Sequence, residues 1–339
     1  MILIRADANK IIGVGHVMRC LSIGHEISKK GEDVLFVTAD HDGDGLIHQN
    51  GFESICLNSN WANMDDEIAD IKRVLLDKHP SLFFIDSYYV TQKYFKEIKN
   101  YVKTVYMDDL NSAIWDVDYL INYNIFSSIF DYSIYESTNT RLLLGTQYAP
   151  LRNEFKNGNE FTIREEVKNI FVSAGGSDPT GITEKIIEKI CPIIESVSFH
   201  FIVGPLNPRK EHILEIADHV GNAVIHINEK NMSDLMKTCD VAVSASGSTL
   251  YELCAVGIPT ITYSLADNQL MATEEFAKQG ILLSIGDCRE NKDFVYQIRE
   301  QIKMLCDDRE LRLDLSSRMR NIVDGRGAER IVDALTIEH

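Results

Sequence analysis

The first 31 residues, "MILIRADANKIIGVGHVMRCLSIGHEISKKG" (1–31), indicate the type of fold. The apolar run 2–5 predicts a strand, and residues 16–30 have the spacing of an amphipathic helix. Gly13 and Gly15 lie between the two and are followed directly by His16. A strand, a glycine-containing turn and a helix form the repeating unit of a parallel α/β sheet.

The same alternation continues along the chain in two series. In the first series we predict strands at 34–37, 82–86, 104–107, 119–122 and 141–145, with helices between them. The alternation stops in the polar stretch 146–168 and then restarts, with strands predicted at 169–176, 197–204, 222–227, 240–247, 259–263 and 281–285. The end of the chain, 291–336, is helical by composition and spacing. We therefore expect two doubly wound, Rossmann-like α/β domains, 1–150 and 151–339, which face a ligand-binding cleft.

Composition excludes several classes of function. The chain has 339 residues and a formal net charge of −17, so nucleic acid and anionic membrane surfaces are poor partners. Its seven cysteines are scattered and form no CxxC pair, which disfavours zinc sites and disulfides. The N-terminus lacks the pattern of a signal peptide, and no apolar run approaches the ~18 residues of a membrane span. We expect a reduced, cytoplasmic protein that needs no metal and no cofactor.

The strongest chemical signal is "VAVSASGSTLYE" (241–252). A strand, a turn of small residues and a helix start place free backbone N–H groups at a helix N-terminus, which is a typical diphosphate site. Gly247, Ser248 and Thr249 would contact the diphosphate, and Glu252 a ribose. An ordinary capped turn explains the same residues equally well. The stretch "VSAGGSDPTG" (172–181) repeats the pattern with Ser177, and turn chemistry alone is the simpler interpretation there.

His16 lies at or near the predicted helix start, where an imidazole aimed into a cleft could act as a general base. A capping histidine is the alternative. Arg19 does not share the apolar face of this helix, which leaves it as a partner of a phosphate or carboxylate, or simply as a solvated side chain.

Two later strands end in polar residues, "IDSYY" (85–89) and "MDDL" (107–110). Polar residues at the carboxyl ends of parallel strands are candidates for a site. Each could also cap a helix, and for Asp108 and Asp109 we favour the cap.

Taken in order, "IRADANKIIGVGHVMRCLSI", "IDSYY", "DDL", "LLLGTQYAPLRNEF", "FVSAGGSDPTG", "VSASGSTLYE" and "DNQ" resemble one family over residues 1–285. This family is the UDP-sugar hydrolases of pseudaminic acid biosynthesis, which remove UDP from a diacetamido-trideoxy-altrose nucleotide. The resemblance implies a GT-B-like fold, similar to that of two-domain glycosyltransferases, in which the final helices may cross back to the first domain. The same kind of sequence occurs in gene sets for spore-coat and other surface glycans.

The resemblance also implies roles for individual residues. His16 matches the family's general base, which would activate the water that attacks the anomeric carbon. With the residues singled out above, the candidates for binding the UDP-sugar are Asp7, Gly13, Gly15, Arg19, Tyr88, Arg152, Ser177, Ile227, Gly247, Ser248, Thr249, Glu252, Asn268 and Gln269. For Asp7, Arg19, Tyr88 and Arg152, a role in the scaffold is the open alternative.

The expected function is therefore removal of UDP from UDP-2,4-diacetamido-2,4,6-trideoxy-β-L-altropyranose or a close nucleotide sugar. The main alternative is a GT-B glycosyltransferase with a UDP-sugar donor. A hydrolysing 2-epimerase and a non-catalytic UDP-sugar sensor remain open as well, and the oligomeric state does not follow from the sequence.

Overall fold

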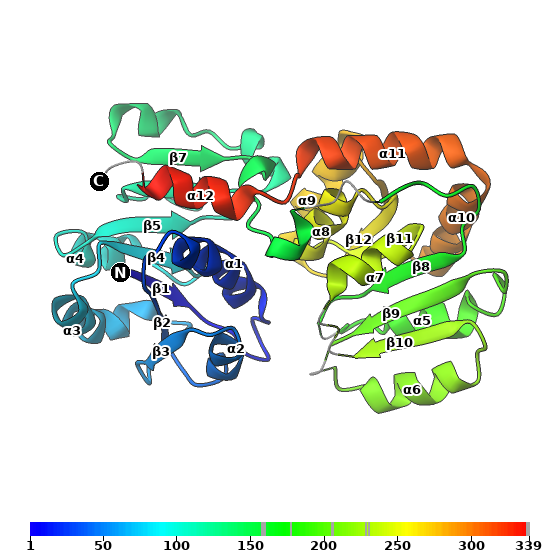
Figure 1. The fold of residues 1–339 in the computed structure, drawn as a ribbon, viewed down its shortest axis with the longest axis horizontal. Coiled ribbons are helices and arrows are strands. Elements are labelled where there is room, and N and C mark those ends of the chain that lie inside the picture. The colour runs from blue at the N-terminus through cyan, green and yellow to red at the C-terminus, as the bar shows by residue number, and fades with distance from the viewer. Residues whose placement is uncertain (157–160, 177, 205–206, 228, 230, 337–339) are drawn as a thin grey trace. The chain divides into compact units, whose positions relative to one another are not determined.

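The computed structural model describes residues 1–156, 161–176, 178–204, 207–227, 229 and 231–336. The chain divides into two compact units (Figure 1). The first comprises Met1–Arg152 together with Arg326–His339, and the second comprises Asn153–Gly325.

The first unit is built on a seven-stranded parallel sheet of order β3-β2-β1-β4-β5-β6-β7. Its strands are β1 (Ile2–Ala6), β2 (Val34–Thr38), β3 (Glu53–Cys56), β4 (Leu82–Asp86), β5 (Lys103–Met107), β6 (Tyr119–Asn122) and β7 (Arg141–Leu144). Its helices are α1 (Gly15–Lys29), α2 (Asp44–Gln49), α3 (Ile68–Lys78), α4 (Gln92–Ile98) and α12 (Gly327–Thr336). Short 3-10 turns occupy η1 (Met64–Glu67), η2 (Ile125–Ile129), η3 (Ser133–Ser137) and η4 (Thr146–Tyr148).

The second unit contains a six-stranded parallel sheet of order β10-β9-β8-β11-β12-β13. Its strands are β8 (Asn169–Ser173), β9 (Ser198–Val203), β10 (Ala223–Ile227), β11 (Val241–Ala245), β12 (Thr260–Ser264) and β13 (Leu283–Asp287). Its helices are η5 (Asn153–Phe155), α5 (Ile182–Lys189), α6 (Lys210–Asp218), α7 (Met232–Thr238), α8 (Ser248–Val256), α9 (Asp267–Lys278), α10 (Phe294–Asp307) and α11 (Arg309–Ile322).

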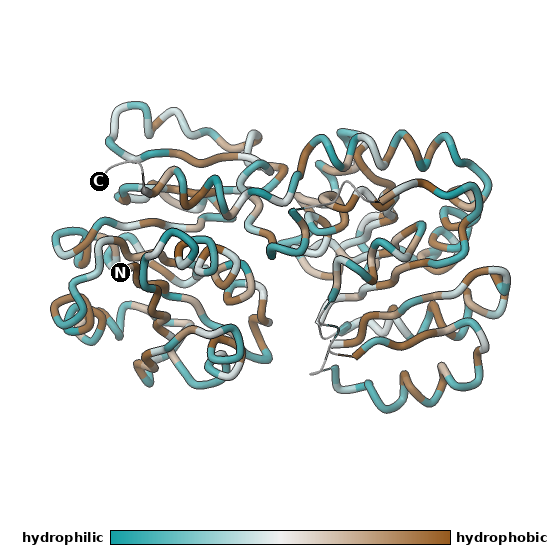
Figure 2. Tube along the Cα trace, viewed as in Figure 1, coloured by the Kyte–Doolittle hydropathy of each residue, from teal (hydrophilic) through white to brown (hydrophobic). Residues whose placement is uncertain are grey.

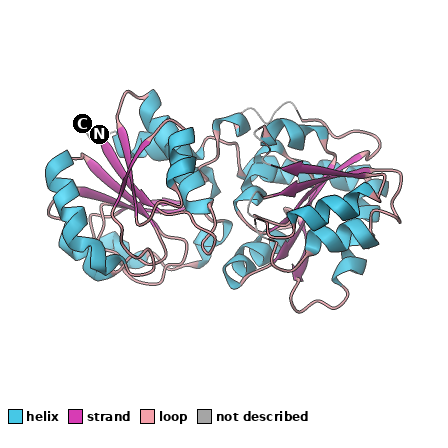
Figure 3. Cartoon of the chain, turned by 90° about the horizontal axis from the view of Figure 1, so that it is seen from below, coloured by secondary structure: helices cyan, strands magenta, loops and turns pink. Residues whose placement is uncertain are grey.

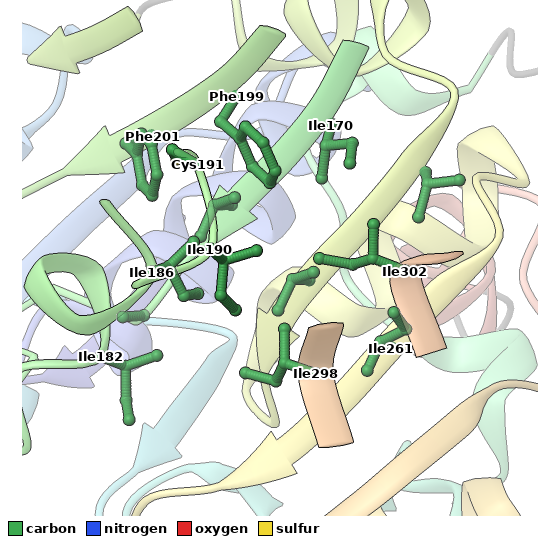
Figure 4. Close-up of a cluster of buried hydrophobic side chains, with 14 of the residues drawn as sticks. Ile170, Ile182, Ile186, Ile190, Cys191, Phe199, Phe201, Ile261, Ile298 and Ile302 are labelled. Atoms are coloured by element: carbon green, nitrogen blue, oxygen red, sulfur yellow. The ribbon is translucent and has the colours of Figure 1, made fainter. Parts of the chain in front are cut away.

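In both units the strands lie between layers of helices (Figure 3). This arrangement buries both faces of each sheet, so the strands are runs of apolar residues, which appear brown in Figure 2. In the first unit Leu3, Phe83 and Leu120 are fully buried. In the second unit, Ile186 of α5 and Ile298 of α10 pack in one cluster with Phe199 and Ile261 of the sheet (Figure 4).

The strand order reverses once in each sheet. In the sheet of the first unit, the strands run outward from β1 through β2 to β3, and β4 then lies on the other side of β1. The second sheet does the same between β8 and β11. The loops that follow the carboxyl ends of the two strands at such a switch point diverge, and ligands of doubly wound sheets bind there.

Each strand predicted from the sequence overlaps an observed strand, whereas one strand, one α-helix and the short 3-10 turns η2 to η5 were missed. Strand β3 and the short helix α2 before it have no counterpart in the prediction. β3 lies at the sheet edge, where Glu53 is exposed and the other residues are half-buried, so it lacks the apolar run that marks the inner strands. The long helical region at the end of the chain is divided into α10, α11 and α12.

Candidate functional site

The loop between β1 and α1 is shaped by its own side chains. The Asn9 side-chain oxygen accepts hydrogen bonds from the backbone N–H groups of Ile11 and Ile12 at 2.9 and 3.0 Å. The backbones of Asn9 and Gly13 pair in an isolated antiparallel bridge. Gly13 has a φ of +75°, which glycine adopts without strain. The loop closes on itself, and His16 is thereby placed in the first turn of α1.

His16 forms a close pair with Asp86, the last residue of β4. Its Nδ1 atom lies 2.6 Å from Asp86 Oδ1, and both side chains are buried. Arg19, one turn along α1, holds the same carboxylate with two bonds, from Nε to Oδ2 at 2.6 Å and from an NH2 group to Oδ1 at 2.5 Å. The helix and the neighbouring strand therefore fix the imidazole through one shared carboxylate.

The same guanidinium group extends the network to the next two strands. Arg19 also donates to Asp109 and to the Tyr123 hydroxyl, both at 2.9 Å. Asp109 in turn accepts from Tyr88 at 3.0 Å and from Asn124 at 2.8 Å. The cluster is thus drawn from the carboxyl ends of β4, β5 and β6 and from the start of α1. It contains two carboxylates and one guanidinium, which leaves one excess negative charge beside His16.

These contacts determine which protonation states are stable. Burial alone would raise the pKa of Asp86, but Arg19 and His16 hold it well below its usual range. Asp86 is therefore ionised and can only accept, so the hydrogen between the two residues belongs to Nδ1 of His16. In a neutral imidazole with this tautomer, the lone pair is on Nε2. Burial, together with the Asp109 carboxylate, raises the pKa of Tyr88 well above normal, so its hydroxyl stays protonated.

A second buried network supports Asp7, which follows β1. Arg5 on β1 forms an ion pair with Asp7 at 2.6 Å and donates two hydrogen bonds to Glu67 at 2.8 and 3.0 Å. Burial lowers the pKa of Arg5, but the two carboxylates outweigh this and raise it overall. The other Asp7 oxygen accepts from the Ala39 backbone at 2.7 Å. Asp7 is thereby held rigidly at the end of β1.

These elements surround a pocket at the carboxyl edge of the first sheet, above the switch point between β1 and β4. Its lining consists of Asp7, Ile12, His16, Trp61, Asp86, Ser87, Tyr88 and Tyr89. Three of the predicted residues, Asp7, His16 and Tyr88, are thus brought together. Gly13 lies in the preceding loop, Gly15 is the first residue of α1, and Arg19 lies one turn after His16 on the same helix. Arg152 is half-buried and lies at the end of the first unit's N-terminal segment.

The second unit carries the predicted nucleotide residues at the carboxyl edge of its own sheet. Gly247 occupies the N-cap position of α8, with Ser248 and Thr249 as the first two helical residues. Gly247 and Ser248 are exposed, and Thr249 and Glu252 are half-buried. The start of this nine-residue helix is therefore exposed, at the end where backbone N–H groups could bind an anion.

A chain of hydroxyl groups supports the turn before α8. Ser246 bonds to Thr262 at 2.8 Å and accepts from Thr273 at 2.5 Å, and Thr262 also donates to the Ser244 carbonyl at 3.0 Å. All four side chains are buried. The turn is fixed by β12 and α9 as well as by its own strand.

The loops that follow β8 and β9 approach closely at two glycines. A Cβ atom at Gly204 would lie 2.3 Å from the carbonyl oxygen of Gly176. Asp178 accepts from the backbone N–H groups of Ile182 and Thr183, both at 2.9 Å, and so caps α5. The predicted residue Ser177 lies outside the described residues.

The remaining predicted residues lie at the end of β10 or in the helix after β12, both of which belong to the second unit. Ile227 is the last residue of β10, and Asn268 and Gln269 lie in the first turn of α9. Asn268 is exposed. The Gln269 side-chain oxygen accepts from the Leu265 backbone at 2.8 Å, so this group also stabilises the loop after β12.

The structure corrects one interpretation and adds several residues. Asp109 was predicted to cap a helix, but its carboxylate binds Arg19, Tyr88 and Asn124. Asp108 caps no helix either, because the described chain has none between β5 and β6; it accepts from the Leu110 and Asn111 backbone in a turn and from Trp115 Nε1, each at 3.0 Å. The sequence analysis included Asp86 only among the polar residues at strand ends and predicted no specific role for it, although an acidic residue that ends a strand beside the switch point is a usable signal.

Trp61 had no such signal, because it lies in the loop after the missed strand β3. The pairing of Arg5 with Glu67 spans 62 residues of chain and shows in no local pattern. Within the described ranges no three His, Cys, Asp or Glu side chains group as metal ligands would. No helix in those same ranges is long and apolar enough to cross a membrane.

The chain is similar in sequence to several curated proteins. No family model matches the chain. It is 26% identical to the spore coat polysaccharide biosynthesis protein SpsG of Bacillus subtilis over 97% of this chain and 96% of that protein. It is 24% identical to the UDP-2,4-diacetamido-2,4,6-trideoxy-β-L-altropyranose hydrolase of Campylobacter jejuni over 82% of this chain and 97% of that one. The chain spans about half the length of two further curated relatives, 58% of one and 48% of the other.

Among solved structures, MurG of Acinetobacter baumannii matches with a TM-score of 0.69 at 11% identity, covering 98% of each chain. The protein has the GT-B fold, as the sequence predicted. It is a distant relative of UDP-sugar hydrolases and of a spore-coat polysaccharide protein.

Proposed function

We propose that this protein is a hydrolase that removes UDP from UDP-2,4-diacetamido-2,4,6-trideoxy-β-L-altropyranose or a close nucleotide sugar during synthesis of a surface glycan. The similarity to hydrolases of this substrate supports the reaction class. The observation that carries the proposal is the 2.6 Å contact between His16 Nδ1 and Asp86 at a pocket.

This contact supplies what hydrolysis requires. Asp86 keeps the hydrogen on Nδ1, so Nε2 of His16 accepts a proton from water as the water oxygen attacks the anomeric carbon. The bond between that carbon and the diphosphate oxygen breaks, and its electron pair leaves with UDP. The resulting imidazolium keeps its Nδ1 hydrogen bond to the Asp86 carboxylate.

In this proposal the nucleotide binds to the second unit. The N–H groups at the exposed start of α8 would bind the diphosphate and stabilise the charge that develops on departing UDP. Ser248 and Thr249 add hydroxyl donors, and Glu252 would accept from the ribose. Asp7 and Tyr88 would contact the sugar beside His16.

The test is hydrolysis of the named substrate in H2¹⁸O, followed by phosphorus and proton NMR and by mass spectrometry. We expect UDP and free sugar, with the ¹⁸O on the sugar, because water attacks carbon rather than phosphorus. His16→Ala should lower the rate about 10²–10⁴-fold. His25→Ala, an exposed histidine on the same helix, is the matched control and should retain activity. UDP binding without release would instead favour a glycosyltransferase, and a screen of acceptors would follow.

A further inference from the structure

The pocket beside His16 contains an aromatic pair, Trp61 and Tyr89, that the proposed reaction does not use. Their rings meet edge to face with centroids 5.1 Å apart. Ile12 completes the apolar part of the lining. The other lining residues are polar and lie at the ends of β1 and β4, so the pocket combines one polar and one apolar set of side chains.

The aromatic pair is exposed although it is held in place. Tyr89 is 40% exposed, and Trp61 is only half-buried. Core aromatic residues of the same unit, such as Tyr94 and Phe95, are completely buried. Large apolar rings that line a pocket and remain open to it are typical of ligand contacts rather than of packing.

Hydrogen bonds of Ser59 hold the loop that carries Trp61. Ser59 donates from its hydroxyl to Glu67 at 2.7 Å and from its backbone to the Ala39 carbonyl at 2.9 Å. Glu67 is held in turn by Arg5, on the central strand of the sheet. The Tyr89 backbone donates to the Ser87 hydroxyl at 3.1 Å. The two rings are therefore presented by rigid loops.

We propose that Trp61 and Tyr89 form a subsite for a methyl-bearing substituent of the sugar, either the methyl of an N-acyl group or a 6-deoxy carbon. A methyl group gains by leaving water for an aromatic surface, whereas a sugar hydroxyl placed there loses hydrogen bonds to water. The subsite would thus select deoxy or N-acylated sugars over fully hydroxylated ones. This inference rests on the proposed function, because it assigns the sugar to this pocket.

The test uses four nucleotide sugars that differ only in the two groups in question: UDP-glucose, UDP-N-acetylglucosamine, UDP-6-deoxyglucose and UDP-N-acetyl-6-deoxyglucosamine. Dissociation constants for these and for UDP alone are measured by calorimetry. The wild-type protein should bind at least one methyl-bearing sugar about tenfold more tightly than UDP-glucose. The set shows whether the N-acyl or the 6-deoxy methyl is responsible.

Trp61→Ala and Tyr89→Ala should each reduce this preference to about twofold or less while leaving the affinity for UDP unchanged. Tyr101→Ala is the matched control, because Tyr101 is similarly exposed, at 44%, on the same unit but does not line the pocket. The inference is overturned if the wild type shows no preference or if the preference survives both substitutions. Failure to bind UDP at all would instead overturn the proposed function, on which the subsite depends.

Discussion

Replacing Asp86 with Asn tests the central contact of the candidate site. The carboxylate accepts from His16 and Arg19 at Oδ1 and from Arg19 again at Oδ2. An Asn side chain has one oxygen and one NH2 group, so in either orientation the NH2 group faces a donor of Arg19. In the orientation that places NH2 at the Oδ1 position, it also forces the His16 hydrogen onto Nε2, where the proposed base must be free.

The contacts of Asp86 determine how much stability and how much activity the substitution should cost. Removing one partner of a buried ion pair costs about 3–5 kcal/mol. Arg19 keeps its bonds to Asp109 and Tyr123, so we expect the lower end, about 3 kcal/mol of unfolding free energy. Loss of the correctly oriented base should reduce the rate of UDP release about 10²–10⁴-fold.

The assay can follow the first unit alone, because both tryptophans of the chain, Trp61 and Trp115, lie in it. Urea unfolding monitored by tryptophan fluorescence is compared for Asp86→Asn and for Asp116→Asn. Asp116 is 70% exposed and paired with Lys99 at the surface, so its replacement should cost less than about 1 kcal/mol. If the two variants lose similar stability and both retain full activity, the reasoning about Asp86 is refuted.

Three further predictions follow from the same contacts. The pKa of Asp86 is lowered in the folded protein, so the stabilising contribution of its carboxylate is complete above about pH 5 and is lost as the pH falls below about 4. The free energies of unfolding of the wild type and of Asp86→Asn, measured in urea, should therefore converge in acid. Gly204→Ala should destabilise the second unit by about 1–3 kcal/mol, because the added Cβ would collide with the Gly176 carbonyl, and the loss is measurable by thermal unfolding. Gly247→Ala should fold normally, because the backbone of Gly247 is extended and an added Cβ meets no described atom within 4 Å beyond its chain neighbours. The added methyl group should nevertheless obstruct the start of α8, so we expect UDP to bind about tenfold more weakly when its affinity is measured by calorimetry.

The alternation of apolar runs and helical segments predicted the fold because it reflects a local requirement. Strands covered on both faces must be apolar throughout, and the helices between them must have one apolar side. β3 escaped this rule because an edge strand is covered less completely and tolerates Glu53. The turns after β1 and β11 could also be predicted from the sequence, because the backbone of a tight turn favours glycine at particular positions.

By itself, the sequence determined the doubly wound architecture, the strand ends that carry polar residues, and the place of His16 at the start of α1. Only the tertiary structure decided which of these residues meet. Strand order placed β4 beside β1 and β5 beside β4, and so brought Asp86 and Asp109 to Arg19 across 67 and 90 residues of chain. The reason is physical: burial and shared hydrogen bonds make Asp86 a partner of His16, and these depend on neighbours in space that no local pattern records.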